Sequence, residues 1–209
     1  MAHLLEMKNI CKSFSGVSVL KNNHLELEAG EVHALLGENG AGKSTLIKIL
    51  GGVYTKDSGQ ILVDGQEVEI TGVESAKEHG IRIIHQELML IPDMTISENI
   101  FIGQEPKTKA GTVDKKKMNE MAQGFLDSMH LDLKSTQFIR DLNIAQQQMV
   151  EIIRAISFGA KIIVMDEPTS SLTENEVDAL FEAIKALKAK NVGIIYISHR
   201  MAELDARSE

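Results

Sequence analysis

The chain has 209 residues, of which 43% are hydrophobic and 25% are charged, a composition typical of a globular protein with one substantial core. The formal net charge of −8 argues against a nucleic-acid partner, and no run of about 18 apolar residues is present that could span a membrane. Cys11 is the single cysteine, so an internal disulfide is excluded, and residues 1–8 lack the pattern of a signal peptide. Any attachment to a membrane is therefore expected to come through partner proteins.

Short apolar runs alternate with helical patterns along the chain, which predicts an α/β domain. Residues 24–27 alternate polar and apolar, and residues 61–70 predict a hairpin around an Asp-Gly turn, so the first third should hold antiparallel strands. Residues 32–36 are apolar at all but one position. Residues 162–165 and 194–197 are continuous apolar runs that follow helical patterns, which is typical of strands inside a parallel sheet covered on both faces.

Residues 87–157 form a polar stretch rich in Met, Lys and Gln, which predicts a helical insertion whose methionines fill its core. Within it, residues 107–117 are a basic, glycine-containing loop that is expected to be solvated. The helical spacing of the insertion is carried by Met118, Met121, Phe125 and Met129.

Residues 173–190 predict a further helix. Thr173 and Glu176 have the spacing of a capping box at its start, and lysines gather toward its C-terminal end. One face carries an apolar stripe made of Val177, Leu180, Phe181, Ile184 and Leu187.

Residues 37–44 read Gly-Glu-Asn-Gly-Ala-Gly-Lys-Ser, which fits the phosphate-loop pattern G-x-x-x-x-G-K-[ST] between an apolar strand and a helical run. The glycines let backbone N–H groups converge on phosphate oxygens, and the helix N-terminus adds partial positive charge. Lys43 can reach the β- and γ-phosphates of ATP, and the Ser44 hydroxyl can ligate Mg²⁺. The residues expected to bind nucleotide here are Gly37, Glu38, Asn39, Gly40, Ala41, Gly42, Lys43, Ser44 and Thr45.

The apolar run of residues 162–165 ends in two adjacent carboxylates, Asp166 and Glu167. Asp166 suits a contact to Mg²⁺, directly or through water, and Glu167 is placed to polarise the attacking water as a general base. An acidic pair after a strand is common on its own. The phosphate loop in the same chain is what favours the catalytic interpretation.

Five motifs stand in order: the phosphate loop, Gln86, residues 142–146 (Leu-Asn-Ile-Ala-Gln), residues 166–170 (Asp-Glu-Pro-Thr-Ser) and His199. This order resembles the ATPase cassette of ABC transporters over nearly the whole chain. The resemblance implies a P-loop NTPase fold with a mixed β-sheet core, an N-terminal antiparallel β-subdomain and an inserted α-helical subdomain. The implied core covers residues 1–86 and 158–209, and the implied helical subdomain covers about residues 87–157.

The resemblance also implies roles for single residues. Gln86 would contact Mg²⁺ and the attacking water, and His199 would sense the γ-phosphate. Phe14 matches the aromatic residue that stacks on adenine, with Val19 beside the ribose. Residues 171–173 match the family's D-loop region.

Residues 142–146 match the family's signature segment, which opens a helix and faces a γ-phosphate bound on a second cassette. The family sequence there is Leu-Ser-Gly-Gly-Gln, so this chain departs from it with Asn for Ser and with Ile-Ala for two glycines. Asparagine can still donate a hydrogen bond, although its reach differs from that of serine. The residues expected to bind nucleotide are Asn143, Ala145 and Gln146.

Within the family, residues 145–152, 166–177 and 196–201 resemble the ATPases of monosaccharide importers, first those for galactose and methyl galactoside and then those for ribose and xylose. Such importers work with membrane permease subunits and an extracytoplasmic sugar-binding protein, and their ATPases lie peripherally on the cytoplasmic face of the membrane. Those ATPases carry two cassettes in one chain. Because this chain stops soon after His199, it is expected to be an N-terminal cassette shortened at its C-terminal end.

Three other functions are disfavoured by the sequence. A soluble ABC ATPase acting in translation or DNA repair would have a different continuation after Asp-Glu-Pro-Thr and a basic surface, unlike residues 170–172 and the net charge of −8. A nucleotide-binding module without turnover would not need Glu167. A guanine-specific GTPase would need an Asn-Lys-x-Asp element after a later strand, and the sequence has none.

Overall fold

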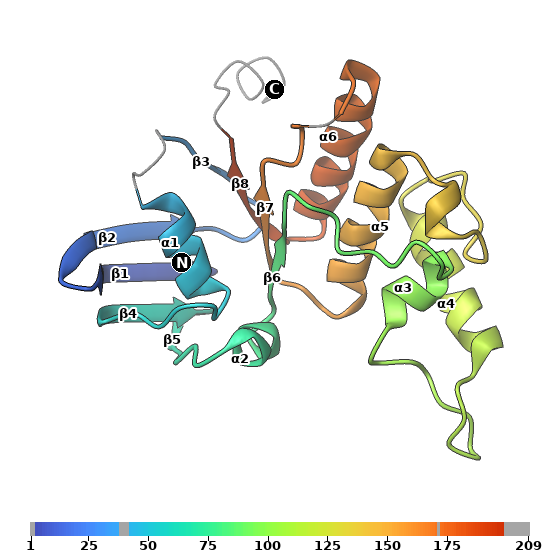
Figure 1. Cartoon of the computed structure of the whole chain (residues 1–209), viewed down its shortest axis with the longest axis horizontal. Helices are drawn as coiled ribbons and strands as arrows, with labels where there is room; N and C mark the ends of the chain where they lie inside the picture. The colour runs from blue at the N-terminus through green and yellow to red at the C-terminus, as the bar shows by residue number, and fades with distance from the viewer. Residues whose placement is uncertain (1–2, 38–41, 171, 199–209) are drawn as a thin grey trace.

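The computed structural model of the chain describes residues 3–37, 42–170 and 172–198, and this part of the chain contains two four-stranded sheets (Figure 1). The first sheet is antiparallel and has the strand order β2-β1-β4-β5. Its strands are β1 (Leu5–Phe14), β2 (Val17–Leu27), β4 (Ser58–Val63) and β5 (Gln66–Glu67). The second sheet is parallel, in the order β3-β8-β7-β6, and consists of β3 (Val32–Leu35), β8 (Gly193–Ile197), β7 (Ile162–Asp166) and β6 (Ile81–Ile84).

The predicted Asp-Gly hairpin is present between β4 and β5. Asp64 (φ 52°) and Gly65 (φ 74°) both lie in the left-handed region, which a two-residue type I′ turn requires. The second strand differs from the prediction, because β5 pairs directly after the turn at Gln66–Glu67 rather than at residues 68–70. Val68 still continues the ladder, since its N–H donates to the carbonyl of Ile61 at 2.9 Å.

The parallel sheet is covered on both faces, as its continuous apolar strands predict. Successive residues of β7 and β8 point to opposite faces, so they pack in two different clusters. On one face lie the antiparallel sheet, α1 (Lys43–Leu50) and α2 (Val73–Glu78), and on the other lie α5 (Ile144–Ser157) and α6 (Glu174–Ala189). The first face receives Ile162, Val164, Ile195 and Ile197, and the second receives Ile163, Met165, Ile194 and Tyr196.

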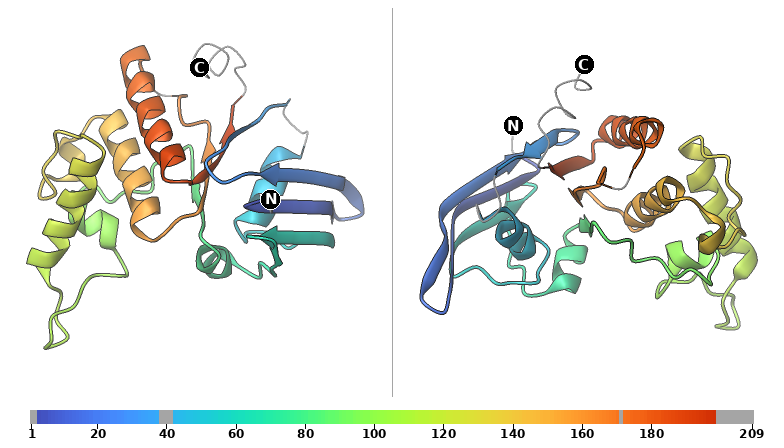
Figure 2. Two further views of the ribbon diagram at one scale, coloured as in Figure 1. Left: turned by 180° about the vertical axis from the view of Figure 1, so that it is seen from behind. Right: turned by 45° about the horizontal axis from the view of Figure 1, so that its top comes forward.

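The helices of the predicted insertion pack together at the end of the molecule remote from the antiparallel sheet (Figure 2). α3 (Ile96–Phe101), α4 (Lys115–Ser128), a short 3-10 helix (Ile139–Asp141) and one side of α5 share a third apolar cluster. Met118 is buried in this cluster as predicted, but Met121 is 41% exposed, so its prediction as core was wrong. The helical spacing was correct, and Met121 lies at the edge of the buried face because α4 buries only Met118, Ala122 and Leu126.

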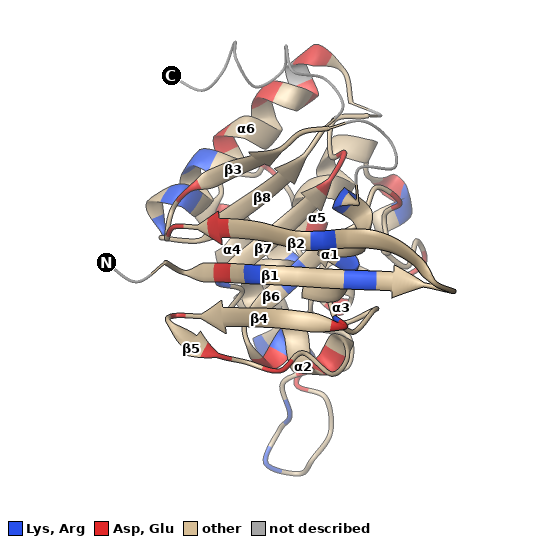
Figure 3. Ribbon diagram, turned by 90° about the vertical axis from the view of Figure 1, so that its left-hand side faces the viewer, with Lys and Arg blue, Asp and Glu red and all other residues tan. Residues whose placement is uncertain are grey.

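The basic loop between α3 and α4 projects away from the rest of the molecule, with its lysines in blue at the bottom of Figure 3. Lys107 and Lys109 are exposed there, and a single bridge between Lys107 and Val113 closes the loop. The solvated loop that the sequence predicts is therefore confirmed.

The predicted helix at residues 173–190 is α6, with Thr173 at its N-cap. The Thr173 N–H and hydroxyl both donate to Oε2 of Glu176 at 2.9 Å, which confirms the capping box. The five residues of the apolar stripe are all buried against the parallel sheet.

Candidate nucleotide-binding site

The parallel sheet brings four functional segments to one edge. Its strands all run in the same direction, with Leu35 opposite Ile197, Ile197 opposite Asp166, and Ile84 opposite Met165. The carboxyl ends of β3, β8, β7 and β6 therefore lie side by side, and in open α/β sheets this edge is where ligands bind. From it the chain continues into the phosphate loop, the Asp-Glu pair, the Gln86 segment and, after Ser198, the predicted His199.

The phosphate loop ends at Gly42, which is the N-cap of α1. Gly42 has φ 84°, and a Cβ atom there would lie 2.6 Å from Cδ2 of Leu20 and 3.3 Å from the carbonyl oxygen of Val19. Both the dihedral and the close approach of β2 require glycine at this position. The first turn of an α-helix presents N–H groups that have no acceptor within the helix, and such a turn favours an anion.

Lys43 is the first residue of α1, and its Nζ donates to the carbonyl of Gly37 at the start of the loop. The ammonium group therefore lies beside Gly37. Ser44 is exposed on the same turn and Thr45 is half-buried. Four of the predicted nucleotide-binding residues, Glu38, Asn39, Gly40 and Ala41, lie outside the described residues, as does His199.

Glu167 directly follows β7 and is held in an unusual conformation. Its φ is 48°, in the left-handed region, which costs a non-glycine residue on the order of 1 kcal/mol or more. Its N–H donates to the carbonyl of Ile197 at 3.0 Å, and its own carbonyl accepts from the N–H of Ser170 at 3.2 Å. The neighbouring β8 and the following turn thus fix the backbone of Glu167 and, beside it, the half-buried Asp166.

Gln86 lies next to this acidic turn. It follows β6 by two residues, and its Nε2 donates to Oγ of Ser170 at 3.4 Å. The structure therefore brings Gln86 and the Asp166–Glu167 turn together, although they are far apart in the sequence.

Residues 143–146 open α5, which lies on the opposite face of the parallel sheet from α1 (Figure 1). Asn143 is the N-cap: its side-chain oxygen accepts from the N–H of Gln146 at 2.8 Å, and Oε1 of Gln146 accepts from the N–H of Asn143 at 3.0 Å. The asparagine that replaces the family's serine therefore still caps the helix. Asn143, Ala145 and Gln146 are thus separated by the parallel sheet from α1, which follows the phosphate loop in the same chain.

Phe14 and Val19 lie on the first two strands of the antiparallel sheet, β1 and β2. Phe14 ends β1, is 37% exposed and meets Tyr54 edge to face, with ring centroids 5.1 Å apart. Val19 is half-buried on β2, where its carbonyl approaches Gly42. The exposed ring of Phe14 is thus packed on Tyr54, and Val19 lies beside the N-cap of α1.

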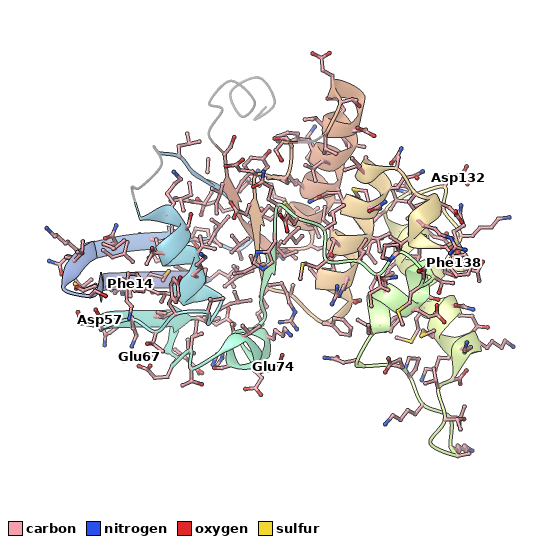
Figure 4. The ribbon with its side chains drawn as sticks, in the orientation of Figure 1. Phe14, Asp57, Glu67, Glu74, Asp132 and Phe138 are labelled. Atoms are coloured by element: carbon pink, nitrogen blue, oxygen red, sulfur yellow. The ribbon has the colours of Figure 1, made fainter. Side chains whose placement is uncertain are left out.

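Asp57 holds the end of β1 that carries Phe14, and both residues are labelled together in Figure 4. Its carboxylate accepts from Lys12 Nζ at 2.8 Å and from the N–H of Ser13 at 2.7 Å. The hydrogen bond from Lys12 and then that from Ser13 hold the pKa of Asp57 below its usual value.

Comparison with known proteins decides the family. Residues 20–170 match the family model described as ABC transporter. The chain belongs to the ABC transporter family. Across the solved structures, the cassette superimposes on a nucleotide-free ATP-binding cassette from an ABC transporter with a TM-score of 0.83 and 25% identity, over 99% of this chain and 85% of that one. The ADP conformation of another such cassette gives a TM-score of 0.83 and 26% identity, over 98% and 84%.

Two curated relatives are much closer in sequence. The cassette is 52% identical over 203 residues to a putative ribose/galactose/methyl galactoside import ATP-binding protein of Halalkalibacterium halodurans, covering 97% of this chain and 39% of that protein. It is 50% identical over 202 residues to a ribose import ATP-binding protein of Clostridium perfringens (strain 13), covering 96% and 40%. The chain thus spans about two fifths of the length of these relatives.

Tyr54 packs on Phe14 and escaped the sequence analysis, because no pattern in the sequence marks it. Thr169 and Tyr196 lie in segments that the sequence analysis singled out, but the contact between them was not predicted. Their hydroxyls lie 3.4 Å apart in a buried position under the Glu167 turn. Among the described residues, no helix is long and apolar enough to cross a membrane.

Proposed function

We propose that the cassette binds Mg-ATP at the carboxyl edge of its parallel sheet and hydrolyses it to power monosaccharide import through a membrane permease. The observation that carries this proposal is the convergence of the phosphate loop, the Asp166–Glu167 turn and Gln86 at one sheet edge. The names of the curated relatives, which are ribose and galactose import ATP-binding proteins, supply the transport function and the class of sugar.

The phosphate chain would lie at the N-terminus of α1, with Lys43 reaching the β- and γ-phosphates. The candidate Mg²⁺ ligands are the hydroxyl of Ser44, the side-chain oxygen of Gln86 and the carboxylate of Asp166. These groups offer oxygen atoms, which Mg²⁺ prefers, so the residues present fit this ion. When bound, Mg²⁺ neutralises charge on the phosphate oxygens.

Hydrolysis then requires one proton transfer and one displacement. Glu167 would take a proton from water as the water oxygen attacks the γ-phosphorus, and the bond between that phosphorus and the β–γ bridging oxygen breaks to give ADP and phosphate. Gln86 would orient the same water and His199 would hold the γ-phosphate. The backbone hydrogen bonds of Glu167 support this role because they fix the residue at the carboxyl edge of the sheet.

Adenine would stack on Phe14, with Tyr54 holding that ring, and the ribose would lie beside Val19. A second cassette would supply its Asn143, Ala145 and Gln146 to the γ-phosphate, because these residues lie away from the phosphate loop of their own chain. The remaining proposed partners are the permease subunits and an extracytoplasmic sugar-binding protein. In this proposal the cassette would lie on the cytoplasmic face of the membrane, and the helical subdomain, about residues 87–157, would dock on the permease.

A matched pair of lysine variants tests the nucleotide site. Lys43→Ala should weaken Mg-ATP binding and abolish phosphate release, whereas Lys185→Ala, at an exposed lysine on α6, should leave both unchanged. Binding is measured by calorimetric titration and turnover by phosphate release. Equal affinity and equal turnover in the two variants would refute the site.

A further inference from the structure

The basic loop, residues 107–117, has a local charge opposite to that of the whole chain. It holds five lysines and one acidic residue, whereas the formal net charge of the chain is −8. All five lysine side chains are exposed: Lys107, Lys109, Lys115, Lys116 and Lys117. Within the described part of the chain, two of them form ion pairs. Lys115 lies 3.7 Å from Glu98, and the distance from Lys116 to Glu120 is 3.9 Å. Exposed pairs of this length contribute little, so the loop keeps its positive charge available to a partner.

Three of these lysines lie where a helix disfavours them. Residues 115–117 form the first turn of α4, which contains no acidic residue. This end of a helix is the positive end of its dipole, so cations here lower the stability of the helix. The N-cap Asp114 supplies one negative charge, and its Oδ1 accepts from the N–H of Lys117 at 3.0 Å. Acidic side chains would solvate this turn equally well and would stabilise the helix, so the lysines favour an anionic partner.

The first part of the loop is a hairpin with an ordered backbone. A bridge joins Lys107 to Val113, and the N–H of Thr108 donates to the carbonyl of Thr112 at 2.8 Å. The hydroxyls of the same two threonines lie 2.9 Å apart. The N–H of Gly111 donates to the carbonyl of Thr108 at 3.0 Å. Because these groups bond to one another, the hairpin needs little further ordering when it meets a partner.

The hairpin presents apolar groups beside its lysines. Val113 is 44% exposed, and Ala110 in the turn is exposed as well. Opposite residues of an antiparallel pair share one face, so the side chain of Val113 lies on the same side as that of Lys107. Lysines combined with a small exposed apolar group are typical of segments that bind the surface of an anionic membrane.

The loop lies at the end of the molecule remote from the nucleotide edge. The carboxyl ends of β3, β7 and β8 are toward the top of Figure 1 and the loop is at the bottom, as it is in the left-hand view of Figure 2. α5 begins at the upper end too, so residues 143–146, proposed to face a second cassette, lie away from the loop. A membrane in contact with the loop would therefore leave the nucleotide edge open.

We propose that the basic loop binds anionic lipid headgroups of the membrane, with its lysines on the phosphates and Val113 in the interfacial region. The inference rests on the proposed transport function, which brings the cassette to a membrane, and adds a direct contact with lipid. A fluid lipid surface can place phosphates under several separated lysines, which a single small anion cannot. A nucleic acid is disfavoured, because the loop has no aromatic residue or arginine to stack on bases and the whole chain is acidic.

Vesicle sedimentation tests the contact with lipid. The chain is mixed with vesicles of phosphatidylcholine alone, or of equal parts of phosphatidylcholine and phosphatidylglycerol, and the bound fraction is measured. We expect binding to the anionic vesicles only, and weaker binding as the salt concentration rises. Lys107→Gln combined with Lys109→Gln should weaken binding about 30-fold, on the order of fivefold for each lysine. Lys21→Gln combined with Lys185→Gln, at exposed positions on β2 and α6, is the control for the loss of two positive charges elsewhere.

A tryptophan probe locates the contact. The chain contains no tryptophan, so Val113→Trp carries a single indole fluorophore on the hairpin. Its emission should shift to the blue with the anionic vesicles and should be quenched by lipids that are brominated in their acyl chains. Val17→Trp, at an exposed position at the start of β2, is the matched control and should show neither change.

Three results would overturn the lipid contact: no binding of the wild type to anionic vesicles, equal binding by the two double variants, or equal blue shifts at residues 17 and 113. Thermal unfolding shows whether each variant is folded. Misfolding of the variant lacking Lys107 and Lys109 leaves the decision to the tryptophan probe and to the salt dependence of the wild type.

Phosphate release by the wild type without vesicles tests the proposed function separately. Retained turnover with no vesicle binding overturns only the lipid contact. Absent turnover with vesicle binding intact overturns the proposed ATPase activity and leaves the contact standing.

Discussion

The sheet edge and the helical insertion differ in how their functional groups are positioned. At the sheet edge, each group follows directly from a strand or begins a helix, so parallel pairing alone brings the phosphate loop, Gln86 and Glu167 together. At the junction with the insertion, hydrogen bonds join side chains to backbone groups far away in the sequence. Arg82 donates to the carbonyl of Phe158, and Glu151 accepts from the N–H of Met89. The first kind of site can be predicted from motifs and topology, and the second requires the folded structure.

Glu167→Gln should have the largest effect at the sheet edge. It keeps the size of the side chain but removes the base, so turnover should fall by roughly 10² or more while Mg-ATP binding persists. Phosphate release and nucleotide titration measure the two quantities. Glu174→Gln, at an exposed position at the start of α6, is the control, and equal turnover in both variants would remove Glu167 from the mechanism.

Gly42→Ala should distort the phosphate loop. At φ 84° the added Cβ is strained and lies 2.6 Å from Leu20, so we expect a stability loss of about 1–3 kcal/mol together with weaker nucleotide binding. Gly16→Ala is the control that measures the backbone strain alone, because Gly16 has nearly the same φ, 83°, but no atom within 4 Å of the added Cβ. Urea unfolding measures the free energy of unfolding of both variants. A loss no larger in Gly42→Ala than in Gly16→Ala would mean that the contact with Leu20 relaxes freely.

Glu151→Ala tests how the segment after Gln86 is held against α5. It leaves the N–H of Met89 without its acceptor, which should cost about 1–3 kcal/mol and speed hydrogen exchange of that amide. Exposed Glu87→Ala is the control. An unchanged hydrogen-exchange rate at the Met89 amide would show that its hydrogen bond to Glu151 does not hold the segment after Gln86.

The same substitution has an expected pH dependence. Because burial raises the pKa of Glu151 above the ordinary 4.5, the folded protein holds this proton more tightly than the unfolded chain does. The contribution of Glu151 to stability is therefore complete below about pH 4.5 and declines as the pH rises through the raised pKa. The cost of Glu151→Ala should be smaller at pH 8 than at pH 4.

Phe14→Ala should have the smallest effect. Stacking is worth on the order of 1 kcal/mol and distinguishes bases poorly, so the dissociation constants for ATP and GTP should both rise about fivefold. Val17→Ala, at an exposed position on the adjoining strand, is the control. A change confined to ATP would contradict simple stacking.

Much of the fold was predictable because it is specified by local sequence. The parallel strands at residues 162–165 and 194–197 are confirmed because continuous apolar runs indicate burial on both faces. The Asp-Gly turn and the capping box of α6 are confirmed because a few neighbouring residue types specify each of them. Met121 was mispredicted because it lies at the edge of the buried face of α4, and β5 was mispredicted because the two-residue turn pairs the residues that directly follow it. The left-handed backbone of Glu167 and the packing of Tyr54 on Phe14 left no signal, because neighbouring elements impose them.

The central claim is that the carboxyl edge of the parallel sheet is the ATP site. A structure of Glu167→Gln determined with Mg-ATP tests this claim most directly. We predict phosphates against the N-terminus of α1, the γ-phosphate within reach of residue 167 and Gln86, and adenine on Phe14. Nucleotide bound elsewhere, or phosphates away from Gly42 and Lys43, would contradict it.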